Sequence, residues 1–268
     1  MPGSIARTPG IYGFREALNM ELSVIMPALN EEKSIISVID CTINAFRILN
    51  IDAELIVIND GSTDMTADLV NNIAKKNPSI KILNHLTPRG IGACFWDGVD
   101  NSSAGAVCLI PSDNEVEPSE ILRYFKLMDD VDMVIPFVFN KEVRAKVRNT
   151  VSFIFKFIIN STFGTSLNYT NGTVIYRRSL LAELGKRNSG FFYQADILIR
   201  LVKKGFLFAE VPYSLRRREG GKSKAINLRS LKAVIKGYLS LVWDIYIRKE
   251  ASQKEFNVNS LTYKRTQQ

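Results

Sequence analysis

The sequence is poor in the residues that build zinc sites, disulfide frameworks and membrane spans. It has one histidine, His85, and three cysteines, Cys41, Cys94 and Cys108, whose spacing matches no metal-binding motif. An odd number of scattered cysteines favours a reduced, cytoplasmic protein over a secreted one. No run approaches the roughly 18 to 20 apolar residues of a membrane-spanning helix. We therefore expect no cysteine-based metal site and no integral membrane segment.

The length of 268 residues suits one α/β domain with short appendages. The first 20 residues lack the apolar core of a signal peptide, and we expect an N-terminal extension there. We assign residues 21–227 to the main domain and 228–250 to an amphipathic C-terminal helix. Residues 251–268 are polar, and we expect them to form a disordered tail.

Positive charge is concentrated late in the chain. The net charge is +8, and between Arg216 and Lys236 eight basic residues stand against Glu219 alone. Such a patch attracts polyanions, which include nucleic acid, an anionic lipid surface and a substrate diphosphate. A solvated helix face is the structural alternative.

The first 140 residues alternate short β-branched runs with amphipathic segments, which predicts βαβ units and a mostly parallel sheet. The predicted strands cover residues 22–26, 54–59, 80–83, 106–110 and 133–139. The predicted helices cover residues 31–49, 63–76, 92–101 and 118–128. Ligands of such sheets bind at the carboxyl ends of the strands. The polar clusters that follow the strands are therefore expected to face one crevice.

Beyond residue 141 the pattern changes to aromatic and basic helices. We expect helices at 142–163, 193–204 and 228–249, and short strands near 173–176 and 206–212. The first and last of these helices carry more apolar surface than one core contact requires. We expect them to lie in a membrane interface, or to pack against a second copy or a membrane protein. Ordinary core packing is the alternative.

Two acidic side chains, Asp113 and Glu115, follow the fourth predicted strand. A carboxylate pair at positions i and i+2, at the carboxyl end of a buried strand, suits a divalent cation that carries phosphates. No histidine lies near enough in the sequence to complete a zinc site. Hard oxygen ligands favour Mg²⁺ or Mn²⁺, with substrate phosphates in the remaining positions.

Other polar clusters have structural explanations as well as functional ones. Asn30 and Glu31 follow the first strand, where they suit a helix cap and a first helical turn. Asp60 begins a turn, and it is also placed to accept hydrogen bonds from a nucleobase or ribose. Arg89 precedes a Gly-containing helix start, which favours an anion contact. We interpret His85 as a surface or packing residue.

Together these clusters resemble glycosyltransferase family 2, and within it the dolichol-phosphate mannose synthases and polyprenyl-phosphate hexose transferases. The resemblance spans about Leu22 to Ser240 and rests on the motifs at 24–32, 57–64, 112–115 and 218–224. It implies a GT-A fold, with a doubly wound, mostly parallel sheet and C-terminal amphipathic helices. It also implies an inverting transfer from a UDP-sugar or GDP-sugar to a lipid-linked acceptor, with polyprenyl phosphate favoured.

The resemblance also assigns residues to roles. Asp113 and Glu115 hold the metal on the donor diphosphate. Arg148 and Ser152 keep the Arg-x-x-x-Ser spacing of enzymes that act on lipid phosphates, and they are assigned with Gln194 to the acceptor. The residues expected around the donor are Pro27, Asn30, Glu31, Asp60, Arg89 and Ser112.

The expected chemistry depends on the acceptor. The cation, together with Arg218 and Lys224 of the basic segment, neutralises charge that builds on the leaving diphosphate. A lipid phosphate is already an anion and needs no general base. A sugar or glycolipid hydroxyl needs one, and Asp196 is then the candidate. For the lipid phosphate we expect a peripheral protein at the inner face of the cytoplasmic membrane.

Three departures from the family pattern bear on these expectations. Pro111 stands where relatives have a first aspartate, and Glu115 where the lipid-linked branch often has glutamine. The arginine expected at the end of the fifth strand is replaced near Val138, which favours a hydroxyl acceptor. Pro111 leaves open a nucleotide-sugar-binding module without catalysis. A nucleic-acid binder accounts for the basic patch but not for the acidic crevice, so we expect no nucleic-acid partner.

Overall fold

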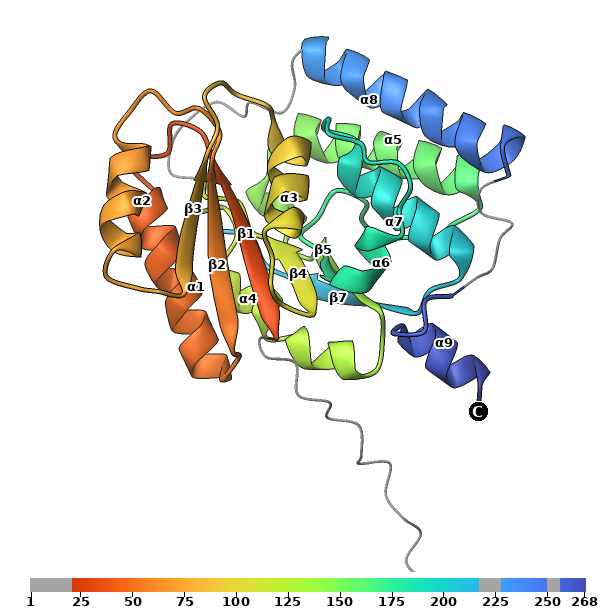
Figure 1. Ribbon diagram of the computed structural model, residues 1–268. Helices are drawn as coiled ribbons and strands as arrows, with labels where there is room; N and C mark the ends of the chain where they lie inside the picture. The colour runs from red at the N-terminus through yellow and green to blue at the C-terminus, as the bar shows by residue number, and fades with distance from the viewer. Residues whose placement is uncertain (1–20, 217–227, 250–255) are drawn as a thin grey trace, which may run out of the picture.

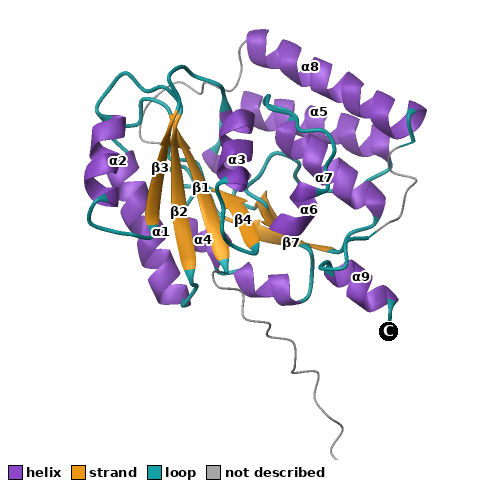
Figure 2. Cartoon of the chain, in the orientation of Figure 1, coloured by secondary structure: helices purple, strands orange, loops and turns teal. Residues whose placement is uncertain are grey.

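The computed structural model describes residues 21–216, 228–249 and 256–268 (Figure 1). They form a seven-stranded sheet in the order β3-β2-β1-β4-β6-β5-β7, with helices on both faces (Figure 2). The strands are β1 (Leu22–Ala28), β2 (Ala53–Asn59), β3 (Ile80–Asn84), β4 (Ala106–Leu109), β5 (Met133–Val138), β6 (Ile175–Arg177) and β7 (Phe208–Tyr213). The α-helices are α1 (Ile35–Leu49), α2 (Thr66–Ala74), α3 (Ile91–Asp100), α4 (Pro118–Leu122), α5 (Lys146–Phe163), α6 (Arg178–Ala182), α7 (Tyr193–Lys204), α8 (Leu228–Val242) and α9 (Leu261–Thr266). Shorter helical turns are η1 (Phe125–Asp129), η2 (Lys141–Val143) and the π-helix η3 (Trp243–Ile247).

The sheet confirms the predicted α/β fold. Strands β1 to β4 pair in parallel, and β5 pairs in parallel with β7. Strand β6 is antiparallel to both of its neighbours, β4 and β5. The register sets Ala28 of β1 against Asn59 of β2, and Asn59 against Asn84 of β3. The carboxyl ends of these strands therefore lie level, and the loops that follow them meet at one edge.

The central strands are mostly apolar because helices cover both faces of the sheet, and their buried polar residues include Ser23 and Glu54. Alternate residues of β1 enter different cores. Val24 joins the cluster under α1 and α4, and Ile25 joins the cluster under α3 and α7. Helix α3 approaches β1 closely at Gly98, where an added Cβ would come within 2.5 Å of the Ile25 side chain. This close packing brings the start of α3 to the carboxyl edge of β1 and β2.

Helices α1 and α2 begin three or four residues later than predicted, at Ile35 and Thr66. The residues before them are held in turns by hydrogen bonds between the two strand-end loops, which a helix would break. Helix α4 ends at Leu122, and η1 follows it as a separate turn. Helix α5 begins at Lys146, after η2, and α8 passes into the π-helix η3.

Helix α8 packs beside α5 and α7 at one edge of the molecule, and α9 lies elsewhere, near β7 (Figure 1). Thr162 of α5 and Tyr238 of α8 share a hydrogen bond of 2.8 Å, and the Phe163 and Tyr246 rings stack 6.1 Å apart. Leu241 and Ile245 enter the core below. Within the described ranges, no helix combines the length and apolarity that crossing a membrane requires.

The prediction of a disordered tail is wrong for residues 256–268, which include α9. Asp132, which is fully buried, accepts backbone hydrogen bonds from Leu261 (2.7 Å) and Thr262 (3.0 Å) and forms an ion pair with Arg177 (3.4 Å). Ser260 caps α9 by accepting from the backbone N–H of Tyr263. Leu261 and Thr262 lie 129 and 130 positions from Asp132 in the sequence, so the polar composition of the tail could not reveal these contacts.

Replacing Asp132 with alanine is expected to release α9. The change leaves two backbone donors and Arg177 without their buried acceptor, and breaking such an arrangement costs about 3 to 5 kcal/mol. Urea unfolding measures the loss in the free energy of unfolding. Asp129→Ala, a substitution of an exposed acid three residues earlier, is the matched control. Equal stability of Asp132→Ala and the wild type would contradict this account of the tail.

Candidate active site

The loops after β1 and β2 are joined by side chain to backbone hydrogen bonds. The Asn30 amide oxygen accepts from the N–H of Thr63 (2.8 Å), and the Asn30 N–H donates to Ser62 Oγ (3.0 Å). The Glu31 N–H donates to Thr66 Oγ1 (2.9 Å). Asn30 adopts a left-handed conformation with φ of 56°, which asparagine tolerates better than most residues. The predicted donor-site residues Asn30 and Glu31 therefore shape the crevice by fixing the two loops together.

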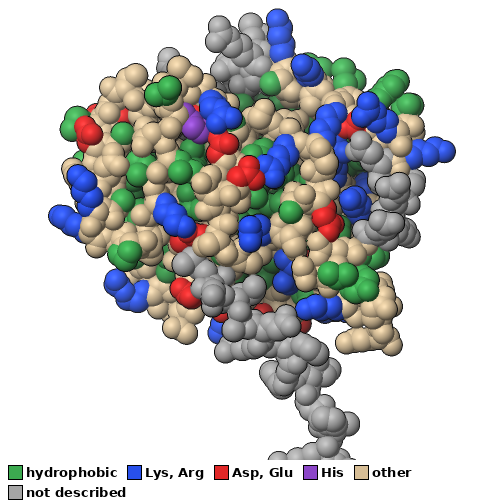
Figure 3. All heavy atoms as spheres, in the orientation of Figure 1, with side chains coloured by type: hydrophobic (Ala, Val, Ile, Leu, Met, Phe, Trp, Pro, Cys, Tyr) green, Lys and Arg blue, Asp and Glu red, His purple; other side chains and the backbone are tan. Residues whose placement is uncertain are grey.

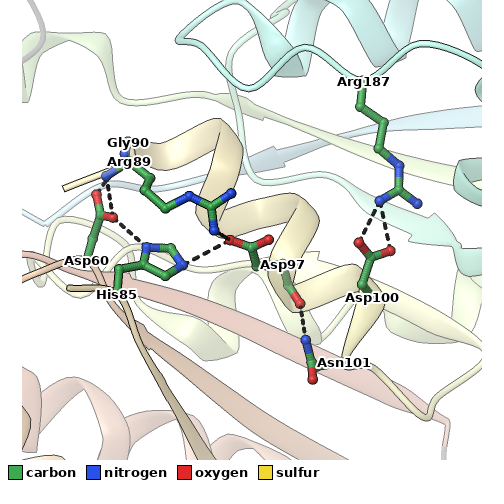
Figure 4. A network of polar contacts seen from close by, with 8 residues as sticks. All are labelled: Asp60, His85, Arg89, Gly90, Asp97, Asp100, Asn101 and Arg187. Carbon is green, nitrogen blue, oxygen red and sulfur yellow. Dashed lines mark hydrogen bonds and ion pairs between the residues drawn. The ribbon is translucent and has the colours of Figure 1, made fainter. Parts of the chain in front are cut away.

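Asp60, at the end of β2, is almost fully buried and holds the loop before α3. Its carboxylate accepts from the N–H groups of Arg89 and Gly90, each at 2.8 Å, and lies 2.7 Å from His85 Nδ1 (Figure 4). Burial favours a higher pKa for Asp60, but the hydrogen bonds from Arg89, His85 and Gly90 hold this pKa below its ordinary value. Asp60 is therefore ionised and fully engaged at neutral pH.

His85 links two carboxylates, which the sequence did not predict. Its Nε2 lies 2.9 Å from Asp97 of α3, and Arg89 donates to the same carboxylate at 2.7 Å (Figure 4). The interpretation of His85 as a simple surface or packing residue is therefore incomplete. Only its place directly after β3 distinguished it in the sequence.

Asp60, His85 and Cys94 are close enough to resemble a metal-binding group. Burial, with the charge of Asp60 nearby, raises the pKa of the Cys94 thiol far above its ordinary value. The Asp60 carboxylate already accepts three protein donors, so hydrogen bonding explains the cluster without a metal.

The acidic loop after β4 lies beside the end of β1. Ser112 Oγ donates to the Pro27 carbonyl oxygen at 2.7 Å, which joins these two predicted donor-site residues. Asp113 Oδ1 accepts from the Glu115 N–H at 3.2 Å. The two carboxylates offer the hard oxygen ligands that Mg²⁺ and Mn²⁺ prefer, and in this respect they fit a divalent cation. Pro111, at the start of this loop, has no side-chain oxygen and adds no ligand.

Glu115 forms an ion pair with Arg148 of α5. Arg148 Nη1 lies 3.1 and 3.2 Å from the two carboxylate oxygens, and Glu115 is only 6% exposed. The structure thus brings a predicted metal ligand and a predicted acceptor residue together. A cation at Glu115 would have to share its carboxylate with Arg148 or replace the guanidinium.

A cavity of about 120 Å³ lies between the acidic loop and the start of α5. It is lined by Pro111, Asp113, Glu115, Val116, Arg144, Arg148, Tyr169, Asn171, Gly172, Thr173, Tyr213 and Leu215. Ser152, one helical turn beyond Arg148, lies outside this lining. Arg144 was not predicted as a site residue, and only its position near Arg148 in a basic stretch distinguished it.

The basic segment leaves the described structure at Arg216, beside the acidic loop. Arg216 donates from its N–H to the Glu115 carbonyl oxygen (2.9 Å) and from its guanidinium to Asn114 (3.2 Å), and it forms an ion pair with Glu117. Arg218 and Lys224, predicted to neutralise the diphosphate, lie outside the described residues. The contacts of Arg216 bring the beginning of the basic segment to the acidic loop that carries the predicted metal ligands.

Asp196 and Gln194, predicted as a catalytic and an acceptor residue, are not among the residues that line the cavity. Gln194 is buried and donates to the Tyr176 hydroxyl at 2.8 Å. Asp196 is 3% exposed and pairs with Arg200 at 3.0 Å, and Arg200 contacts Asp244 of η3 at 2.6 Å. Burial raises the pKa of Asp196 despite the opposing effect of Arg200. These groups hold α7 against the C-terminal helix, so Asp196 is not placed to act as a general base.

Comparison with known proteins places this site in context. A family model described as glycosyl transferase family 2 matches residues 23–185. The chain is 24% identical over 233 residues to polyprenol monophosphomannose synthase of Mycolicibacterium smegmatis, covering 80% of this chain and 84% of that protein. It is 23% identical over 219 residues to undecaprenyl-phosphate mannosyltransferase of Micrococcus luteus, covering 76% and 87%. These relatives confirm the resemblance predicted from the motifs.

A crystal structure of glucosyl-3-phosphoglycerate synthase from Mycobacterium tuberculosis, in complex with Mg²⁺ and uridine diphosphate, has the same fold. The two structures align with a TM-score of 0.63 and 23% identity, over 83% of this chain and 79% of that one. This likeness confirms the GT-A architecture.

Asp60→Asn is expected to lower the free energy of unfolding by about 2 to 3 kcal/mol at pH 7, because the amide cannot accept from all three donors. Hydrogen bonds hold the folded-state pKa of Asp60 below its ordinary value despite its burial, so the unfolded chain binds the proton first as pH falls. The free energy of unfolding of the wild type should therefore decrease as the pH falls below about 4. The difference in this free energy between wild type and Asp60→Asn should become smaller over the same range. Urea unfolding between pH 7 and 3 checks this, with Asp52→Asn, at an exposed carboxylate, as the control. If the difference in the free energy of unfolding between wild type and Asp60→Asn does not change with pH, the ionised Asp60 carboxylate does not have this role.

Proposed function

Since the chain belongs to glycosyltransferase family 2, we propose that it transfers a hexose from a nucleotide-diphosphate sugar to a polyprenyl phosphate, with inversion at the anomeric carbon. The observation that carries this proposal is the cavity where two carboxylates, Asp113 and Glu115, meet two guanidinium groups, Arg144 and Arg148. Such a cavity suits a metal-bound diphosphate on one side and a second phosphate on the other. The two relatives named for polyprenyl or undecaprenyl phosphate chemistry support the acceptor.

The donor side of this proposal uses the crevice beyond β1 and β2. We propose that the nucleoside, of a UDP-sugar or a GDP-sugar, lies along the edge formed by Pro27, Asn30 and Glu31. Asp60 and Arg89 support the nucleoside site indirectly, because they hold the loop before α3 in place. At Gly61 an added Cβ would meet Pro88 at 2.9 Å, so this loop closes tightly over the end of β2.

A divalent cation, when bound by Asp113 and Glu115, supplies positive charge to the diphosphate as it leaves. Arg218 and Lys224 are proposed to add to that charge from the basic segment. The contacts of Arg216 with the acidic loop support this role, because they fix the start of the segment there. Preorganised positive groups of this kind stabilise a leaving anion without reorganising during the reaction.

The acceptor side needs no general base, because a phosphate monoester is already ionised at neutral pH. One of its oxygens can attack the anomeric carbon directly, and a single displacement inverts that centre. The alternative, transfer to a sugar or glycolipid hydroxyl, needs a base to take the hydroxyl proton. Asp196, the base first considered for it, is buried in its ion pair with Arg200. This burial weighs against the hydroxyl acceptor.

The helices beside the active site support a peripheral attachment to the membrane. The exposed apolar side chains of α5 are Val147, Val151, Phe153, Ile154, Phe157 and Ile158. Those of α8 and η3 are Leu231, Ile235, Leu239, Trp243, Tyr246 and Ile247. Lysine and arginine side chains are interspersed with hydrophobic ones over α8 (Figure 3). Apolar side chains mixed with basic ones suit an anionic lipid surface, and we propose the cytoplasmic face.

An assay of donor and acceptor specificity tests the proposed reaction. Purified protein is incubated with UDP-sugars or GDP-sugars, Mg²⁺ or Mn²⁺, and polyprenyl phosphate or none, and both nucleoside diphosphate release and lipid product are followed. We expect product only with the lipid phosphate, and a loss of about 100-fold or more in Asp113→Asn. Glu142→Gln, at an exposed acid near α5, is the control.

The outcomes of this assay separate the alternatives. Nucleotide binding without turnover on any donor would make the chain a binding module. Product on a hydroxyl acceptor alone would support the second reaction. Full activity of Asp113→Asn would show that the cation is held elsewhere.

Flotation with anionic liposomes tests the membrane surface. Removing two apolar side chains in Leu239→Ser/Trp243→Ser is expected to lower the bound fraction by ten-fold or more, since each buried side chain of this size contributes about 1.5 to 3 kcal/mol. Ile48→Ser, an exposed position on α1, is the control. If flotation is unchanged and the wild type instead dimerises through α8 in gel filtration, the surface binds a second copy and not lipid.

A further inference from the structure

We propose that Arg144 and Arg148 form a two-arginine clamp for the acceptor phosphate, with Arg144 supplying the second guanidinium that the end of β5 lacks. This inference rests on the proposed function, because it names the residues that would recognise a phosphate acceptor. Strand β5 ends at Val138, where no basic side chain is available. Arg144 reaches the site from the turn between η2 and α5 instead.

Arg144 is held at the cavity without a carboxylate of its own. Its Nη1 donates to the Tyr169 hydroxyl at 3.2 Å, and its guanidinium carbon lies 5.7 Å from the centre of that ring. Its buried Nε has no hydrogen-bond partner among the described residues. Leaving a buried charged donor unsatisfied is costly, so such a group points to an anionic ligand. Tyr169 fixes the guanidinium in place and leaves this donor available.

The charges around the cavity lead to the same conclusion. Arg148 is neutralised by Glu115, whereas Arg144 donates to the Tyr169 hydroxyl. If a divalent cation draws on Asp113 and Glu115, the two guanidinium groups lose their counter-charge. A phosphate monoester supplies two negative charges and several acceptor oxygens, and it suits two arginines better than a neutral hydroxyl does.

The cavity also has the polarity that a phosphate requires. Tyr169 and Tyr213 line it together with Asn171 and Thr173, and all four can donate hydrogen bonds. Its volume of about 120 Å³ is several times what a single water needs. Because Asp113 lines the same space, a phosphate held here lies next to the group proposed to carry the donor diphosphate.

Binding of a short-chain polyprenyl phosphate and of the matching polyprenol, measured without donor, tests the clamp. We expect wild type to prefer the phosphate, and Arg144→Gln to weaken phosphate binding by roughly 10- to 100-fold, as expected for a lost charged hydrogen bond. Binding of the alcohol should not change. Arg144→Lys should restore part of the preference, because it keeps the charge but not the planar fork. Arg47→Gln, at an exposed position on α1, is the control.

Steady-state kinetics provide the second measurement. In Arg144→Gln the KM for polyprenyl phosphate should rise while the KM for the nucleotide sugar stays constant. Tyr169→Phe, which removes the hydroxyl that positions Arg144, should give a smaller rise and serves if Arg144→Gln does not fold. Lower thermal stability with an unchanged acceptor KM would make Arg144 a packing residue and overturn the clamp.

The binding measurements distinguish failure of the two-arginine clamp from failure of the proposed polyprenyl phosphate acceptor. A wild type that binds phosphate and alcohol equally well would overturn both the clamp and the polyprenyl phosphate acceptor. A wild type that prefers the phosphate, with the same preference in Arg144→Gln, would overturn the clamp alone.

Discussion

The ion pair between Arg148 and Glu115 connects the two halves of the active site. Glu115 belongs to the loop after β4, which carries the predicted metal ligands, and Arg148 belongs to α5, which borders the acceptor side. Glu115 is buried, whereas the Arg148 side chain is 34% exposed. Loss of the pair would therefore leave the buried carboxylate without its counter-charge. The cavity beside it therefore contains opposite charges that balance until substrates arrive. In the proposed reaction, a cation would replace Arg148 at Glu115 and a phosphate would replace Glu115 at Arg148.

The proposed donor site depends on the backbone more than on free side chains. Asn30 and Glu31 join the first two loops, and Asp60 holds the third through two N–H groups and His85. These polar residues follow strands whose carboxyl ends lie level in the sheet. A crevice with walls fixed in this way needs little rearrangement to receive a nucleotide, which reduces the entropy lost on binding.

Helix α8, with η3 at its end, is attached to the domain by ion pairs to the buried carboxylate of Asp244. Arg200 of α7 lies between Asp196 and Asp244, and Lys186 also contacts Asp244 at 2.8 Å. Asp244 lies in the π-helix η3, where the wider turn interrupts the regular α-helix. The apolar face of α8 is thus fixed beside α5, and both helices present apolar side chains outward. The same ion pairs hold the Asp196 side chain in the interface with the C-terminal helix and away from the cavity.

Local patterns in the sequence predicted the strands, most of the helices, the family and the loops that carry the candidate site residues. They could do so because apolar periodicity and turn chemistry act over short stretches of chain, and because parallel strands bring their ends to one edge. Which polar groups meet depends instead on how distant elements pack. Glu115 and Arg148 are 33 positions apart, Arg200 and Asp244 are 44 apart, and Asp132 and Leu261 are 129 apart. Such pairs form only when distant elements pack, so local patterns could place Asp196 on a helix but could not show that it faces Arg200, nor that Arg144 faces the cavity.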